Sequence, residues 1–316
     1  MNRYMRDNCS TKSIKQISLS ELSGKKIAVD ISIYLYKYMG ENTLIENIYL
    51  MISICRYYNI IPLFIFDGKP PTEKKELLMK RRENKLEAER EYNRLKANMD
   101  SLEDESEKAE LVSNMDVLKK QFIYIQREHI NKVKSLIIAY GCSYYDAIGE
   151  ADELCALLVI KKIVWACLSE DMDLFVYGCH RVLRNFSLLN HTAILYNTNE
   201  ILSELNMSQK EFSEICVLSG TDYNIDDQED HTIFSTIKLF RKYQKVKPGT
   251  DFCSWITKSH PNYIKDCESL EHVFKMFDIT RIYEKKEIEK MKIINGSVLR
   301  DDLRSILEED GFFLPI

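Results

Sequence analysis

The chain has 316 residues, of which 45% are hydrophobic and 29% charged, as is usual for a globular protein. No apolar run approaches the roughly 20 residues that a membrane-spanning helix needs, so the sequence argues against a membrane protein. A net charge of −5 argues mildly against a nucleic-acid binder, although clustered metal-binding carboxylates would lower the net charge and bound cations would neutralise it locally.

A βαβ unit is predicted near the start of the chain. Segments 25–32 ("KKIAVDIS") and 60–68 ("IIPLFIFDG") are apolar runs followed by an acid, Asp30 and Asp67, as in buried parallel strands. Between them, residues 43–58 space their apolar positions as a helix does. Ligands of open α/β sheets bind at the carboxyl ends of the strands, so both acids are candidate site residues.

Residues 72–140 are predicted to be almost wholly helical, because they contain neither Gly nor Pro and are rich in Glu, Lys, Leu and Met. The stretch begins with a basic part, and its acidic middle, residues 100–110, is expected to turn or fray. An apolar seam at coiled-coil spacing follows: Leu111, Met115, Leu118, Phe122 and Ile125. Without further information, a solvated helical hairpin is the simplest interpretation.

Downstream, α/β alternation resumes. Residues 142–148 read as a strand, 149–162 as a helix, 163–170 as a buried strand and 180–198 as a β-hairpin. Residues 199–223 read as two helices, the second opened by a capping box of Ser208 and Glu211, and then a turn that contains Asp222. The rest of the chain is mostly helical in pattern. The length allows one large α/β domain or two modest ones.

Acidic residues recur at the strand ends and in the loops that follow them. The candidates are Asp30, Asp67, Glu150, Asp152, Asp171, Asp173 and Asp222. A single acid at a strand end, or in the first turn of a helix, is more often structural. Several that converge would repel one another unless cations lay among them. Oxygen ligands suit Mg²⁺ or Mn²⁺, and no Cys/His cluster favours zinc. Two such ions about 4 Å apart are a standard device for attack on a phosphodiester.

Five motifs, in order, resemble those of the flap endonuclease family of structure-specific 5′-nucleases. They are "VDISIYLYKYM", "FIFDGKPPTEKKELLMKRR", "IGEADELCALL", "LSEDMDLFVYG" and "ICVLSGTDY", and the similarity covers about residues 14–243. The resemblance implies a twisted, mainly parallel sheet flanked by helices, with a helical arch over the active site and a helical C-terminal region. It also implies Mg²⁺-dependent removal of 5′ flaps from branched DNA and 5′-3′ exonuclease action.

The resemblance also assigns roles to residues. All seven acids match metal ligands of the family: Asp30, Asp67, Glu150 and Asp152 mainly for one ion, and Asp171, Asp173 and Asp222 for the other. Lys74 and Arg81 match the basic residues at the base of the arch, and their spacing of seven residues places them on one helical face. Tyr36 matches an aromatic residue that stacks on a base beside the scissile bond, although on its own it would read as core or rim packing. Each of the two cations on its own would read as a surface charge.

Several positions depart from the family pattern. Cellular members typically have Glu where this chain has Asp152, and the shorter side chain is expected to bind through a water. Members of the family have a Gly-Ile-Gly hairpin after the last metal acid, whereas this chain has no Gly there and gains Asp226, Asp227, Glu229 and Asp230. Such residues resist the backbone angles of that turn and repel phosphate. We therefore expect weaker or rearranged duplex binding, in which Lys238, Arg241 and Lys242 still touch the backbone.

The two ends of the chain also differ from the family. Members open with Met-Gly-Ile, whereas this chain opens with "MNRYMRDNC", so we expect a start codon annotated too late or a truncated gene. Cellular members carry a basic tail with a sliding-clamp motif. Phe312 and Phe313 lack the upstream Gln and aliphatic residue of that motif, so clamp binding through this tail is not expected.

The sequence therefore predicts a metal-dependent 5′-flap endonuclease and 5′-3′ exonuclease of DNA replication, repair or recombination, with two Mg²⁺ ions that Mn²⁺ could replace. A catalytically weak or inactive scaffold that binds branched DNA or a partner is the alternative.

One compact nuclease domain is expected, with an N-terminal region 1–200 that includes an arch over 72–140, and a second region 201–316. The nine cysteines have no paired zinc-type spacing and no secretory signal is visible, which indicates a reducing intracellular setting, the nucleus or a viral replication compartment. We expect a monomer without membrane contact.

Overall fold

A seven-stranded sheet forms the centre of the protein, in the order β1-β7-β6-β5-β2-β3-β4. The computed structural model describes residues 1–99, 104–223, 232–246, 248–264, 266–279, 288 and 290–312. Five neighbouring strands are parallel: β6 (Arg181–Ser187), β5 (Ala166–Leu168), β2 (Lys26–Asp30), β3 (Ile61–Phe66) and β4 (Ser143–Asp146). β7 (Thr192–Asn197) pairs antiparallel with β6, and β1 (Ile14–Ser18) pairs antiparallel with β7. The predicted α/β class, mainly parallel sheet and β6–β7 hairpin are confirmed, whereas β1 was not predicted.

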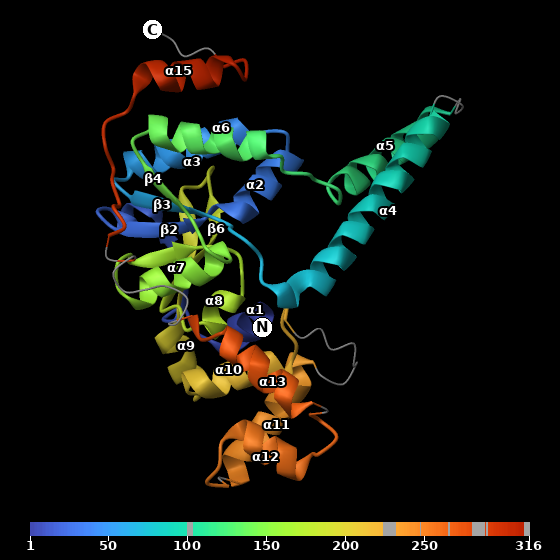
Figure 1. Cartoon of the computed structure of the whole chain (residues 1–316), viewed down its shortest axis with the longest axis vertical. Helices are drawn as coiled ribbons and strands as arrows, with labels where there is room; N and C mark the ends of the chain where they lie inside the picture. Colours follow the sequence, from blue (N-terminus) through green and yellow to red (C-terminus); the bar gives the residue numbers. More distant parts are fainter. Residues whose placement is uncertain are drawn as a thin grey trace.

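Helices cover both faces of the sheet (Figure 1). One face packs against α2 (Ile31–Gly40), α3 (Leu44–Tyr57) and α6 (Arg127–Ala139), and the same core includes Leu303 and Leu307 of α15 (Arg300–Glu308). The other face packs against α7 (Ala151–Ile160), α8 (Asp173–Val176), α9 (Thr198–Leu205) and α10 (Gln209–Leu218). The three central parallel strands, β2, β3 and β5, are short and almost fully buried, which explains why they appear in the sequence as apolar runs.

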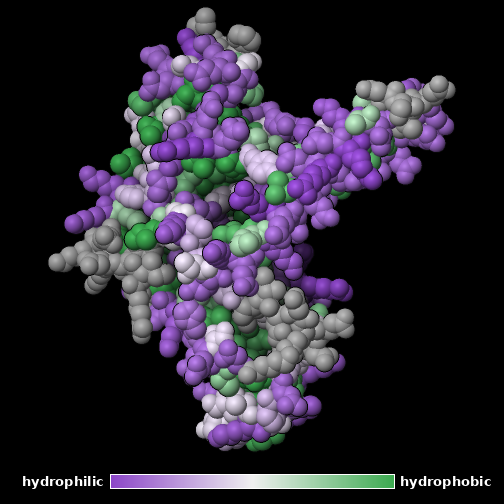
Figure 2. All heavy atoms as spheres, turned by 45° about the vertical axis from the view of Figure 1, so that its right-hand side comes forward, coloured by the Kyte–Doolittle hydropathy of each residue, from purple (hydrophilic) through white to green (hydrophobic). Residues whose placement is uncertain are grey.

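A helical hairpin projects from this body (Figure 1). After the 3₁₀ turn Thr72–Lys74, α4 (Lys75–Met99) runs outward and α5 (Glu105–Lys119) returns beside it. Only Ala88 of α4 and Met115 of α5 are buried, and Figure 2 shows the hairpin covered mainly by hydrophilic side chains.

The arch is shorter than the predicted span of residues 72–140. Its third helix, α6, lies on the body because Val133, Leu136 and Ile137 form a broad buried stripe on the core. Only the segment up to Lys119 projects, so the arch consists of α4 and α5.

A smaller helical layer completes the C-terminal half. α11 (Ile233–Val246) and α12 (Phe252–Ser259) pack through Ile237, Phe240 and Phe252, and α13 (Cys267–Met276) lies against α10.

At the start of the chain, α1 (Asn2–Asn8) lies near α9, and the 3₁₀ turn Leu19–Leu22 follows β1. The capping box at α10 is confirmed: the Ser208 backbone N–H donates to Glu211 Oε2 at 2.7 Å, and Ser208 Oγ accepts from Glu211 N at 3.2 Å. Among the described helices, none is both long and apolar enough to cross a bilayer.

Candidate metal centre

Three neighbouring strands bring their acids to one edge of the sheet. Asp30 is the last residue of β2, Asp67 directly follows β3, and the loop 169–173 follows β5. These strands are parallel and adjacent in the order β5-β2-β3, so their carboxyl ends lie side by side. The structure thus brings together the acids that the sequence predicted there.

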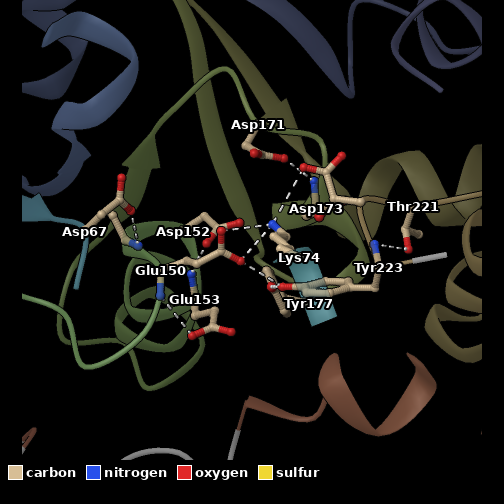
Figure 3. Close-up of polar contacts among 12 residues, drawn as sticks. Asp67, Lys74, Glu150, Asp152, Glu153, Asp171, Asp173, Tyr177, Thr221 and Tyr223 are labelled. Atoms are coloured by element: carbon tan, nitrogen blue, oxygen red, sulfur yellow. Dashed lines mark hydrogen bonds and ion pairs between the residues drawn. The ribbon is translucent and has the colours of Figure 1, made fainter. Parts of the chain in front are cut away.

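The first turn of α7 is fixed against the end of β3. The backbone N–H of Ala151 donates to Asp67 Oδ1 at 2.8 Å, and Gly68 N donates to the carbonyl of Gly149 at 2.8 Å. A Cβ at Gly68 would overlap the carbonyl oxygens of Ala147 and Ile148, so this contact requires glycine. As a result, Glu150 and Asp152 enter the same site as Asp67 (Figure 3).

Three carboxylates come close enough to share one ion. Single oxygens of Asp152, Asp171 and Asp173 all lie within 4.8 Å of one another. The shorter side chain at Asp152 therefore still reaches the cluster. This trio mixes members of the two ligand sets that the sequence resemblance implied, because Asp152 was expected mainly with Asp30, Asp67 and Glu150.

The pKa values of the buried acids show that the site is suited to a cation. Burial, with Asp67 and Asp171 nearby, raises the pKa of Asp30 to about 7. Burial and then the charge of Asp171 raise the pKa of Asp173 to about 7, although Lys74 opposes the shift. The pKa of Asp152 also rises, through burial and then Asp171, Glu150 and Asp30. These carboxylates are unfavourable as anions in the bare protein, and an oxygen-only donor set of this charge fits Mg²⁺ or Mn²⁺.

Ser169 links two of the acids and was not predicted from the sequence. Its hydroxyl donates to Asp30 Oδ2 at 2.8 Å and accepts from the Asp171 backbone N–H at 3.1 Å. Asp171 Oδ1 in turn accepts from Asp173 N at 2.8 Å. Ser169 is fully buried, so this chain of hydrogen bonds fixes the loop after β5 relative to the end of β2. A serine directly before an acidic loop gives no distinctive sequence signal.

Lys74 lies among the carboxylates rather than on the surface. Its side chain is only 5% exposed, and Nζ lies 2.9 Å from Glu150 Oε1, 2.7 Å from Glu150 Oε2 and 3.7 Å from Asp222 Oδ2 (Figure 3). Burial alone would lower the pKa of Lys74, but Glu150, Asp152 and Asp222 together raise it above its ordinary value. The ammonium group is therefore charged and contributes a fixed cation to the site.

Arg81 and Asp222 complete the side of the site next to the arch. Arg81 Nη2 lies 3.0 Å from Asp222 Oδ2, the same oxygen that Lys74 approaches. An open hollow of about 560 Å³ adjoins this pair and is lined by Ile33, Arg81, residues 170–173 and residues 220–222. The hollow leaves Asp171, Asp173, Asp222 and Arg81 open to a ligand from solvent.

Two tyrosines that were not predicted from the sequence also lie in the site. The Tyr223 hydroxyl donates to Glu150 Oε2 at 3.0 Å and lies 3.1 Å from the Tyr177 hydroxyl. Lys74 Nζ lies 4.6 Å from the centroid of the Tyr223 ring. Burial, and then the charge of Glu150, raise the pKa of Tyr223 far above its ordinary value, so the phenol stays protonated. Adjacency to Asp222 was the only available clue.

Tyr36 stands apart from its tyrosine neighbours on α2. Tyr34 and Tyr38 are buried in the core, whereas Tyr36 is 46% exposed. Lys85 Nζ from α4 lies 4.8 Å from the Tyr36 ring centroid. Tyr36 is therefore partly exposed beside α4, with the Lys85 ammonium over its ring.

The basic residues predicted on α11 share one exposed surface. Lys238, Arg241 and Lys242 are exposed, while Ile237 and Phe240 face the core. The acids predicted to replace the glycine hairpin, Asp226, Asp227, Glu229 and Asp230, fall in residues 224–231, outside the described part of the chain. Phe312 packs partly against the core, and Phe313 lies outside the described residues.

Comparisons with known proteins identify relatives of the chain. Residues 6–88 match the XPG N-terminal domain, and residues 141–222 match the XPG I-region. The chain is 30% identical to flap endonuclease 1 of Encephalitozoon cuniculi over 71% of its own length and 66% of the relative. It is 29% identical to the human flap endonuclease 1 over 67% and 57%, respectively. The match thus spans less than two thirds of these two relatives. Against flap endonuclease 1 of Methanococcus aeolicus, it is 26% identical over 94% of this chain and 88% of the relative.

Solved structures share the fold. The catalytic core of Rad2 in complex with DNA substrate superposes with a TM-score of 0.67 at 21% identity, covering 97% of this chain and 92% of that one. Human GEN1 in complex with Holliday junction DNA gives 0.62 at 18% identity, with coverages of 96% and 72%. Flap endonuclease-1 from Methanococcus jannaschii gives 0.60 at 22% identity, with coverages of 94% and 97%.

Proposed function

The chain belongs to the XPG family of structure-specific nucleases, and on this premise we propose that it is a metal-dependent phosphodiester hydrolase that cuts branched DNA, with 5′-flap endonuclease and 5′-3′ exonuclease action. One observation carries the proposal. Acids from three strand ends, one helix start and one distant turn lie in the same site as two cations from the base of the arch. The name of the relatives, flap endonuclease 1, supports a 5′ flap as the substrate, rather than the Holliday junction DNA named for the more distant GEN1 structure.

The metal ligands in this proposal are the seven predicted acids. Asp152, Asp171 and Asp173 would hold one ion, and the remaining carboxylates, Asp30, Asp67, Glu150 and Asp222, would complete the two-ion site, directly or through water. When bound, two Mg²⁺ ions supply an activated water and stabilise charge on the attacking and leaving oxygens. Ser169 and the backbone contact at Gly68 keep the carboxylates in place.

Lys74 and Arg81 are proposed to act on the scissile phosphate. Both cations approach one oxygen of Asp222, so a phosphate at that place would meet the two positive charges together. Donors placed in advance at a developing negative charge stabilise a transition state more than a ground state. Tyr223 and Glu150 hold Lys74 in position, through the ring contact and the ion pair.

The rest of the substrate is proposed to lie across the base of the arch and the α11 surface. Tyr36 would stack on the base beside the scissile bond, because its ring is exposed beside α4. Lys238, Arg241 and Lys242 would contact the duplex backbone, which fixes position without reading sequence.

A catalytically inactive scaffold is the competing proposal. The atypical sequence between Asp222 and α11 favours it, because the family's duplex-binding turn is replaced by acids. Keeping this many buried carboxylates disfavours it, since grouped acids cost stability unless they do chemistry.

One assay separates these proposals. The purified chain is incubated with Mg²⁺ and a labelled panel of flap, nick, gap, bubble and RNA-containing substrates. Cleavage of the 5′ flap at its base, lost on chelation, supports the nuclease; tight binding to every branch without any product supports the scaffold.

We also propose three properties of the chain as a whole. Regions 1–200 and 201–316 would form one nuclease unit, which is supported by the shared core of β2 with Leu303 and Leu307. The chain would act as a monomer. The nine free cysteines are consistent with a reducing intracellular setting such as the nucleus or a viral replication compartment.

A further inference from the structure

The edge of the sheet opposite the metal centre carries a basic hollow. Lys26 is the first residue of β2, Trp165 directly precedes β5, and Arg181 is the first residue of β6. Asp30 lies at the other end of β2, four residues and about 13 Å away. The hollow has a volume of about 740 Å³, and Lys25, Lys162 and His180 also line it.

The cations of the hollow lie at the starts of neighbouring strands. β2, β5 and β6 are adjacent in the sheet, so two strand spacings, about 10 Å, separate the backbone of Lys26 from that of Arg181. Lys25 Nζ lies 4.3 Å from the Trp165 ring centroid, and the guanidinium carbon of Arg181 lies 5.0 Å from it. One ring therefore holds two like charges close together through cation–π contacts.

These cations lack carboxylate partners in the described part of the chain. Among the residues that the structure describes, no acid lines the hollow and no ion pair involves Lys25, Lys26 or Arg181. Lys25 donates only to a backbone carbonyl, that of Glu21, at 2.8 Å. The Glu21 and Glu200 carboxylates pair with other lysines, Lys15 and Lys12.

The positive charge of Lys162 is explained by its position at the end of a helix. It follows the C-terminus of α7, where the helix dipole favours a cation. The excess of positive charge therefore rests on Lys25, Lys26 and Arg181, which lie at or next to the first residues of β2 and β6 rather than at the end of a helix. In a chain of net charge −5, such an uncompensated group points to an anionic ligand.

We propose that the hollow around Trp165 binds closely linked phosphate groups, as in the di- or triphosphate of a nucleotide. A row of about 10 Å accommodates linked phosphates with three or four charges, whereas an acidic peptide presents same-side carboxylates only about every 6.6 Å. Arg181 can bind phosphate oxygens in a two-pronged manner, and Lys25 and Lys26 add point charges. The volume is in the range of small-ligand sites. A nucleic-acid strand also offers phosphates, but each carries one charge and a sugar separates it from the next, so a strand is the competing ligand that the test must distinguish.

Trp165 itself can report the binding. The chain has two tryptophans, so Trp255→Phe leaves Trp165 as the single emitter. This full-length variant is titrated without divalent metal with pyrophosphate, ADP, ATP, a single-stranded oligonucleotide and hexaglutamate. Saturable changes in Trp165 emission are expected with pyrophosphate, ADP and ATP. This readout is independent of cleavage, so failure here leaves the nuclease proposal untouched.

Charge variants in this background test the site. Lys26→Gln combined with Arg181→Gln should weaken ATP binding by about tenfold or more, because charge-assisted hydrogen bonds are lost. The matched control is Lys161→Gln, an exposed lysine that does not line the hollow, which should change affinity by less than about twofold. Circular dichroism and Tm verify that each variant is folded.

The outcomes are distinct. Tighter binding of ATP than of the oligonucleotide supports the proposal, and the reverse order overturns it in favour of a nucleic-acid strand. The proposal is overturned if no phosphate probe changes the emission of Trp165, if hexaglutamate binds as tightly as ATP, or if the Lys161→Gln variant loses as much affinity as the double variant.

Discussion

The ammonium group of Lys74 lies 2.7 Å from Oε2 of Glu150, in a place where both side chains are largely shielded from water. The lysine belongs to the base of the arch and the glutamate to the start of α7, so this ion pair connects the projecting hairpin to the metal centre. A charge fixed in this way is suited to act on a bound phosphate, and this can be measured.

Lys74→Ala should slow cleavage far more than it weakens binding. Loss of one preorganised cation is expected to lower the single-turnover rate by about 100-fold to 1,000-fold. DNA affinity, measured by anisotropy with Ca²⁺ in place of Mg²⁺, should change little. The neighbouring Lys75 is exposed, and Lys75→Ala is the matched control that should keep both values. A loss confined to affinity would mean that Lys74 only positions the DNA backbone.

Asp171→Asn and Asp67→Ala should each abolish cleavage while leaving DNA binding largely intact. Asp171 belongs to the carboxylate trio, and Asp67 accepts the N–H that fixes the start of α7. Asp146 offers a strict control, because it ends β4 at the same edge of the sheet but pairs with Lys134 at 2.5 Å. Full activity in Asp146→Asn with none in Asp171→Asn is the expected pattern. Normal cleavage by the Asp171 variant would refute the two-ion assignment.

Mg²⁺ should stabilise the protein more at about pH 8 than at about pH 5.5. The folded-state pKa of Asp30 and of Asp173 is about 7, above the ordinary value of 3.8. Between these values the folded protein binds more protons than the unfolded chain, so the stability of the metal-free protein falls as pH rises through that window. Mg²⁺ must displace those protons at low pH, whereas at high pH it meets ionised carboxylates whose charge Lys74 offsets only in part.

Thermal unfolding with Mg²⁺ or EDTA across this pH range tests the coupling. In Asp173→Asn, one titrating group is removed, so the pH dependence of the Mg²⁺-induced Tm shift should flatten. An equal Tm shift at both pH values in the unsubstituted chain would contradict proton–metal competition at these acids.

Replacing the α11 cations should weaken duplex binding without altering the chemical step. In the triple variant Lys238→Gln, Arg241→Gln and Lys242→Gln, the slope of log affinity against log salt should fall by about 0.9 per lost phosphate contact. The single-turnover rate at saturating DNA should be unchanged. Lys258→Gln, on the exposed side of α12, is the control. An unchanged salt slope in the triple variant would place the duplex elsewhere.

The sequence correctly predicted the features that depend on a local residue pattern, namely the acids at the strand ends and a helix cap. Asp30, Asp67 and the loop of Asp171 and Asp173 follow apolar runs that had to be buried, and parallel strands bring such ends to one edge. The capping box of Ser208 and Glu211 is likewise a local signal, and it was correct.

What the sequence did not predict depends on tertiary packing. Helical propensity over residues 72–140 could not distinguish α5, which leaves the body, from α6, whose buried stripe keeps it on the core. The grouping of Asp152 with Asp171 and Asp173, and the hydrogen bond from Tyr223 to Glu150, depend on how loops far apart in the sequence pack together. Local periodicity in the sequence does not predict such long-range contacts.

The missing side chain at Gly68 has a consequence for how this site can change over time. The spacing between Asp67 and Glu150 is set by main chain resting on main chain, so neither acid can drift without the other. Residues around the arch can therefore change without altering the separation of Asp67 and Glu150, because direct contact between the two main chains sets it.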